Sequence, residues 1–169
     1  FFDKSILPPP EFMINTFIMQ GGDSFGNCAK TFPVTLPFST VTTMEDAKKS
    51  LVCSSTQHPA SFFRFSVDKA QDVVVSTCFA KTLLNTAIEI TEGCAGTGKC
   101  VTSNLAGRGC VNGAAQLLFP AEAKKNYTAT VYREETAEIA TSVRQFRVAI
   151  FSGEVPANSK CTSPTEINC

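Results

Sequence analysis

The stretch FFRFSVDKAQDVVVSTCFAKTLLNTAIEITEGCAGTGKCVTS, residues 62–103, carries the clearest secondary-structure pattern of the chain. Apolar and polar side chains alternate at residues 63–67, which is the two-residue period of a strand with one face on a core. Residues 73–78 form a β-branched run, and residues 84–91 alternate again. A further strand begins at Cys100 after a glycine-rich turn. We therefore expect the domain to be organised around these consecutive strands.

Strand patterns continue on both sides of this stretch. Upstream, residues 32–38 alternate apolar residues with Pro33 and Pro37, which favours an edge strand because proline has no amide proton to donate. Residues 44–51 are the one weakly helical window. Further strands are predicted downstream at residues 116–119, 127–133 and 145–151. About seven or eight strands at short, regular spacing predict an all-β fold, an antiparallel β-sandwich or jelly roll.

Composition argues against several classes of function. A chain of 169 residues accommodates one domain with extensions. Fifteen Lys and Arg balance fifteen Asp and Glu, so no net field draws the chain to nucleic acid or to an anionic membrane. No apolar run approaches the roughly 18 to 20 residues that a membrane-spanning helix needs. We expect no nucleic-acid partner and no membrane span.

The first 26 residues differ from the rest of the chain. The prolines at residues 8–10 form a stiff spacer, and a glycine-rich break follows at residues 21–26. Between them, residues 12–19 are apolar on both faces, and such a strand needs burial on both sides. We predict that this segment is donated to a neighbouring subunit, and the alternative that it is the first strand of its own sandwich stays open. The predicted subunit contacts are Phe12, Met13, Ile14, Phe17, Ile18 and Met19.

A series of short motifs occupies residues 27–152. They are Asn27-Cys28, the proline-flanked strand at 32–38, Cys53, Phe62-Phe63-Arg64-Phe65, Ser76-Thr77-Cys78, Asn85-Thr86, Gly93-Cys94, Cys100-Val101, Asn104 and Cys110. In this order they resemble the pre-peptidase C-terminal domain family, whose members are small extracellular β-sandwich modules attached to secreted proteases and microbial surface proteins. The resemblance implies a β-sandwich for residues 27–152, with residues 1–26 as an N-terminal extension and residues 153–169 as a cysteine-containing tail.

The resemblance does not extend to a metal site. Some relatives bind calcium through acidic loop residues, and such members tend to have Asn-Asp where this chain has Asn104-Leu105. Residues 93–116 contain no Asp or Glu at all. Calcium requires several oxygen ligands, usually with carboxylates among them. We therefore expect no metal ion and no cofactor.

The eight cysteines indicate disulfide bonds in an oxidising compartment, because they lack paired close spacings and the chain has one histidine. Consecutive antiparallel strands run in opposite directions, so the chain arrives at alternate ends of the sandwich. Cysteines that lie at the same end are expected to meet. The predicted pairs are Cys78 with Cys110, Cys94 with Cys100, Cys28 with Cys53, and Cys161 with Cys169.

One sequon, Asn126-Tyr127-Thr128, lies where a turn enters a predicted strand. In a secreted eukaryotic protein Asn126 is a plausible acceptor for an attached N-linked glycan. A three-residue motif is a weak signal, so an unmodified Asn126 stays open as the alternative.

No catalytic motif stands out. The single histidine, His58, occupies a turn-like context without a nucleophile signature, and we expect it to be an exposed loop residue. The acids that could form a carboxylate pair, Glu89, Glu92, Glu134 and Glu135, are interpreted as solvated side chains on a sheet face. The run from Gly96 to Lys99 lacks the spacing of a phosphate-binding loop and reads as a hairpin turn. We expect a protein without catalytic residues.

Two functional hypotheses follow. The first is a secreted structural subunit that forms a head-to-tail homopolymer, a filament or layer at the cell surface, by strand addition. The alternative is a carbohydrate- or protein-binding accessory module of a larger secreted enzyme or adhesin. The absence of Trp and the presence of only two Tyr provide few aromatic platforms for sugars, which disfavours the alternative.

Overall fold

The computed structural model describes residues 33–44, 48–79, 82, 84–94, 96–104, 110, 113–133 and 144–153. The predicted N-terminal extension, including the contact residues between Phe12 and Met19, lies outside these residues. So do Cys28, the acids Glu134 and Glu135, and the tail beyond Gly153. The predicted cysteine pair of that tail, Cys161 with Cys169, therefore stays a prediction.

The described residues form nine strands and no helix. They are β1 (Phe38–Thr43), β2 (Lys48–Ser50), β3 (Gln57–Ser66), β4 (Gln71–Ser76), β5 (Thr86–Glu92), β6 (Lys99–Asn104), β7 (Gln116–Ala121), β8 (Asn126–Arg133) and β9 (Gln145–Ser152).

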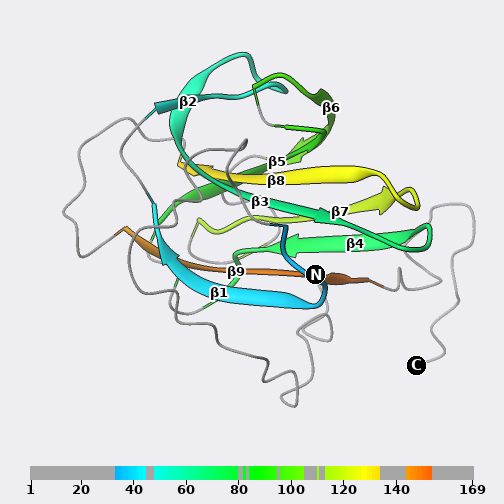
Figure 1. The fold of residues 1–169 in the computed structure, drawn as a ribbon. Coiled ribbons are helices and arrows are strands. Elements are labelled where there is room, and N and C mark those ends of the chain that lie inside the picture. Colours follow the sequence, from blue (N-terminus) through cyan, green and yellow to red (C-terminus); the bar gives the residue numbers. More distant parts are fainter. Residues whose placement is uncertain are drawn as a thin grey trace, which may run out of the picture.

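The strands build two facing antiparallel sheets, which Figure 1 shows as two layers, with β1 and β9 below β3 and β8 in that view. One sheet has the order β1-β9-β4-β7 and the other β2-β3-β8-β5-β6. Without the short β2, each sheet holds four strands. The order of the strands in the two sheets is that of a jelly roll. The predicted fold class is confirmed.

The main core lies between the two sheets. Alternate residues of each strand point inward, as the sequence period requires, so Phe63 and Phe65 of β3 are buried while Ser66 is exposed. Aromatic rings fill the centre: Phe65 lies 6.2 Å from Phe119 and 5.9 Å from Tyr127, centroid to centroid. This core takes apolar side chains from β3, β4, β5, β7, β8 and β9, and Phe38 of β1 packs against it.

Three local predictions differ from the structure. In residues 32–38 only Pro33 forms an isolated bridge, to Arg64, and the regular strand begins at Phe38, just after the second proline of that stretch. The weakly helical window contains β2 instead, because Lys48–Ser50 pairs with the start of β3. β3 itself begins at Gln57, five residues before the predicted stretch, and so includes His58.

A second, smaller core lies on the outer face of the five-stranded sheet. It consists of Leu51, Ala60, Phe62, Ala87 and Tyr132, and Cys94 packs against it. The loop of residues 51–56 reaches over this face toward β6, and β2 and β6 curl toward each other at the top of Figure 1. A Cβ built on Gly96 would lie only 3.9 Å from the Ser50 carbonyl oxygen, which shows how closely the two ends of the sheet approach. The outer face is therefore covered, unlike a solvated sheet face.

Candidate functional site

The disulfide bonds close the covered face and one end of the sandwich. Cys53, in the loop after β2, is bonded to Cys100 of β6. The predicted pairs Cys94 with Cys100 and Cys28 with Cys53 are therefore wrong, because curling of the sheet brings the loop after β2 over β6. Cys94 is also disulfide-bonded.

The bond between Cys78 and Cys110 is the one that strand direction predicts. It joins the end of β4 to the segment between β6 and β7. The two cysteines are 32 residues apart, and their Cα atoms are 5.6 Å apart.

His58 is a structural residue of β3 rather than an exposed loop histidine. It is half-buried, and its Nδ1 lies 2.9 Å from the carbonyl oxygen of Arg133. Its ring centroid is 5.4 Å from that of Tyr132, which belongs to the second core. Pairing of β2 with β3 placed the histidine in the sheet, which the turn-like sequence around it did not reveal.

Glu89 is fully buried, and the expectation that it is a solvated acid is wrong. One carboxylate oxygen accepts a hydrogen bond from the Val52 amide at 3.0 Å, and the other accepts one from the Cys53 amide at 3.1 Å. The side chain thus points outward from the sheet, as its position in β5 predicts. It meets the loop of residues 51–56 instead of water.

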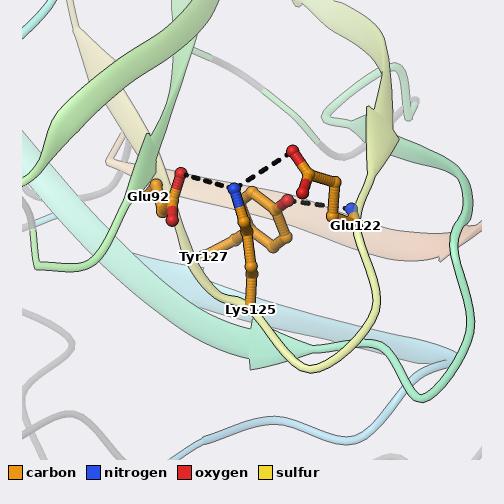
Figure 2. Close-up of polar contacts among 4 residues, drawn as sticks. All are labelled: Glu92, Glu122, Lys125 and Tyr127. Atoms are coloured by element: carbon orange, nitrogen blue, oxygen red, sulfur yellow. Dashed lines mark hydrogen bonds and ion pairs between the residues drawn. The ribbon is translucent and has the colours of Figure 1, made fainter.

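Glu92 belongs to a charged cluster at the end of β5. Figure 2 shows Lys125 between two carboxylates, with its Nζ 3.2 Å from Glu92 Oε2 and 3.0 Å from Glu122 Oε1. The hydrogen bond to Glu122, and then that to Glu92, raises the pKa of Lys125 above its usual 10.5. The Glu122 amide donates to the Tyr127 hydroxyl at 2.9 Å. A tyrosine near the start of a strand that bonds back to the preceding corner is a recurrent device of β-sandwiches, so this cluster orders the β7–β8 turn.

The turn between β5 and β6 is a plain hairpin, as predicted. The amides of Thr97 and Gly98 both donate to the Cys94 carbonyl oxygen, at 3.2 and 2.6 Å. These bonds close the turn on itself. The glycines therefore serve a tight reversal of the chain and leave no open row of amides for a phosphate.

Asn126 is exposed at the first position of β8, which leaves room for a glycan. Thr128, the third residue of the sequon, is buried and donates its hydroxyl to the Gly93 carbonyl oxygen at 2.6 Å. The threonine therefore has a structural role of its own, and glycosylation of Asn126 stays a prediction.

The four edge strands of the two sheets differ in what protects them against pairing with a further strand. Strand edges carry unpaired backbone groups, and proteins block them with charges, prolines or very short strands. β2 is three residues long with two lysines, β6 begins with Lys99 and carries a disulfide, and β7 contains Pro120. β1 has the sequence FSTVTT, with neither a charge nor a proline. Within the described residues it pairs only with β9, so among those residues its other edge has no partner strand.

Next to β1, the main core is bordered by apolar residues that are only partly buried. The partly buried apolar residues that pack against this core are Val34, Leu36 and Phe38, all in or just before β1. On the outer face of the same strand, Val41 is 44% exposed. The sequence predicts an edge strand with protective prolines at residues 32–38, immediately before β1, and not at β1 itself. The uncharged FSTVTT was the signal that could have identified the open edge.

A shallow groove lies where the segment before β1 meets the β3–β4 turn. Its volume is about 430 Å³. It is lined by Pro33, Val34, Thr35 and Leu36, by Ser66 to Lys69 of the β3–β4 turn, and by Gln71 and Ser152. Its walls are mixed in polarity, and Asp68 and Lys69 are exposed.

The described part of the chain contains no group of three or more His, Cys, Asp or Glu side chains that could hold a metal ion. No helix long and apolar enough to cross a bilayer occurs in the same residues.

The chain was compared with known proteins and structures. No protein-family profile and no curated protein sequence matches it. Solved structures do: the pre-peptidase C-terminal domain of a collagenase from Bacillus anthracis is similar over 70% of this chain and 91% of that domain, with a TM-score of 0.45 and 10% identity. A periplasmic inhibitor of g-type lysozyme from Aeromonas hydrophila is similar over 73% of this chain and 96% of that protein, with a TM-score of 0.41 and 14% identity. A domain of the family that the sequence resembles is thus among the structures to which this chain is similar.

Proposed function

We propose that this protein is a non-catalytic, secreted structural subunit. It assembles into an extracellular filament or surface layer by adding its N-terminal segment, residues 12–19, to a neighbouring copy. The observation that carries the proposal is the unprotected edge of β1. Extended segments bind such edges through backbone hydrogen bonds, and pockets for alternate side chains provide specificity.

The chemistry of the donor segment suits this edge. The segment FMINTFIM has no charge and is apolar on both faces. A strand placed beside β1 would point one set of side chains toward Val34, Leu36 and Phe38, and the other set toward the exposed Val41. One face of the donor would then be buried against the main core, and the other would lie beside the exposed Val41. Because the donor and acceptor surfaces of one copy differ, the contact propagates head to tail.

The proposal is tested by removing the donor. A variant that lacks residues 1–20 should be monomeric, and a peptide of those residues should raise its melting temperature in a dose-dependent way, because a ligand of the folded state stabilises it by mass action. Ile14→Asp in the peptide should abolish the rise, since it would place an unpaired charge in a buried position. A full-length protein that stays monomeric at high concentration would contradict assembly.

The edge is tested by a matched pair of substitutions. Val41 of β1 and Leu118 of β7 are each 44% exposed on the same sheet, at its opposite edges. Val41→Lys should block peptide binding and assembly, because an edge lysine opposes strand addition. Leu118→Lys should change neither. Equal effects of the two substitutions would contradict β1 as the acceptor.

The groove at the segment before β1 favours a second function, that of a carbohydrate- or protein-binding accessory module. Ligand sites are concave and combine apolar walls with a few polar groups, and the groove at residues 33–36 and 66–69 has this character. Glycan-array and peptide-array binding that is lost in Asp68→Ala, in a protein that remains monomeric, would support this function over assembly.

A further inference from the structure

Three polar side chains lie together on the covered face of the five-stranded sheet. Glu89, Thr91 and Thr130 are each 0% exposed. Glu89 and Thr91 occupy alternate positions of β5 and so share a face. Thr130 of β8 is the direct cross-strand partner of Glu89. Directly opposite residues such as Glu89 and Thr130 have Cβ atoms roughly 4.5 to 5.5 Å apart, and diagonal pairs such as Thr91 and Thr130 roughly 7 to 8 Å, so the three side chains share one patch of this face.

The polar groups of this patch are not fully satisfied. The hydroxyl oxygens of Thr91 and Thr130 have no hydrogen-bond partner. Glu89 receives its two hydrogen bonds from the Val52 and Cys53 amides. Buried polar groups in folded proteins are nearly always bonded, and unpaired ones commonly mark a bound water or ion.

Glu89 has no ion-pair partner among the described residues, and the ion pairs that join those residues to one another link Lys125 to Glu92 and Glu122. A buried carboxylate is costly unless a cation or several hydrogen bonds stabilise it. Two amide bonds occupy one acceptor site on each oxygen and leave the other sites of the carboxylate available.

We propose that Glu89, Thr91 and Thr130 bind a monovalent inorganic cation such as Na⁺ or K⁺. The carboxylate and the two hydroxyls offer hard oxygen ligands, and one positive charge neutralises the single carboxylate. A divalent ion such as Ca²⁺ ordinarily takes six to eight oxygens with several carboxylates among them, which the described residues do not provide here. A water molecule would form hydrogen bonds with the two hydroxyls but would not neutralise a carboxylate charge.

The bound cation has a structural role in this location. It adds a further contact to the Glu89 carboxylate, whose two oxygens accept hydrogen bonds from the amides of Val52 and Cys53. Those bonds fasten the loop of residues 51–56 over the second core. The proposal is independent of assembly through β1, which lies in the other sheet.

Thermal unfolding of the full-length protein tests the site. Melting temperatures are compared in NaCl, KCl, LiCl and choline chloride at one ionic strength, so that general screening is constant. One inorganic cation should raise the melting temperature by several degrees in a saturable manner, since it binds the folded state alone. Identical melting temperatures in all four salts would overturn the proposal.

Variants assign the effect to these residues. Glu89→Gln and Thr130→Val should remove the cation dependence. Glu92→Gln, on the same strand but bound to Lys125, should retain it. Sodium-23 relaxation gives a second readout that does not depend on unfolding: the protein should broaden the signal, and K⁺ should compete. Cation dependence that survives in a folded Glu89→Gln or Thr130→Val variant would overturn the proposal.

Discussion

The two cores of this protein are built by different means. The main core between the sheets consists of alternate apolar residues from six strands, β3, β4, β5, β7, β8 and β9, with Phe63, Phe65 and Ile88 at most 1% exposed. The second core has five apolar residues and is closed by a loop that a disulfide and the Glu89 carboxylate hold in place. A core of the first kind follows from a local pattern, whereas one of the second kind depends on a few specific bonds between distant residues.

The largest expected effect belongs to the main core. Phe65→Ala should lower the free energy of unfolding by about 3 to 5 kcal/mol, and Ile88→Ala by about 2 to 5 kcal/mol, because each leaves a cavity among packed side chains. Arg64→Ala, one residue from Phe65 but on the opposite face, should cost less than either. Chemical denaturation measures all three, and equal losses would contradict the assigned strand facing.

Removal of the disulfide over the second core should rank next. Cys53→Ala with Cys100→Ala releases a cross-link that spans 47 residues, and the expected loss is about 2 to 4 kcal/mol. Because this bond fastens the loop of residues 51–56, amide hydrogen exchange should rise in that loop while β4 and β9 stay protected. Faster exchange throughout both sheets would show that the two cores do not open independently.

A smaller effect is expected at the corner before β8. Tyr127→Phe keeps the ring in the main core and removes the hydroxyl that accepts the Glu122 amide. The expected loss is about 1 kcal/mol, the usual contribution of one hydrogen bond. Urea denaturation measures this loss of stability. Tyr132→Phe, which removes the tyrosine hydroxyl in the second core, is measured beside it for comparison. A loss as large as that of Phe65→Ala would indicate that the hydroxyl, rather than the ring, dominates the contribution of Tyr127.

The smallest expected effect concerns Lys125. Its pKa is raised in the folded state, so its contribution is fully present below pH 10.5 and is lost as pH rises through the folded pKa. Lys125→Met should therefore destabilise slightly at neutral pH, where the lysine is exposed to solvent screening. The difference from the parent protein should vanish at higher pH in pH-dependent thermal melts. A constant difference across that range would assign the effect to side-chain packing.

The main core and most strand positions were readable from the sequence. Residues 62–103 specify strands because alternation of apolar and polar side chains has one compatible geometry, a pleated strand with one buried face. The same local reasoning placed Cys78 and Cys110 at one end of the sandwich, where they are bonded. Local reasoning failed at residues 44–51, where it predicted a weakly helical window. Pairing with β3, and not local preference, makes Lys48–Ser50 a strand.

The covered outer face was decided by the tertiary structure. A two-residue period states that Glu89 points away from Ile88, but not whether water or another loop lies on that side. The curl of the sheet, with the loop of residues 51–56 folded over it, buries Glu89, and the same curl bonds Cys53 to Cys100 rather than to Cys28. Sequence alone determined most of the strands and the inward face of each of these, because both follow from local geometry. The long-range approach of β2 to β6 decided which outward faces are covered and which cysteines meet.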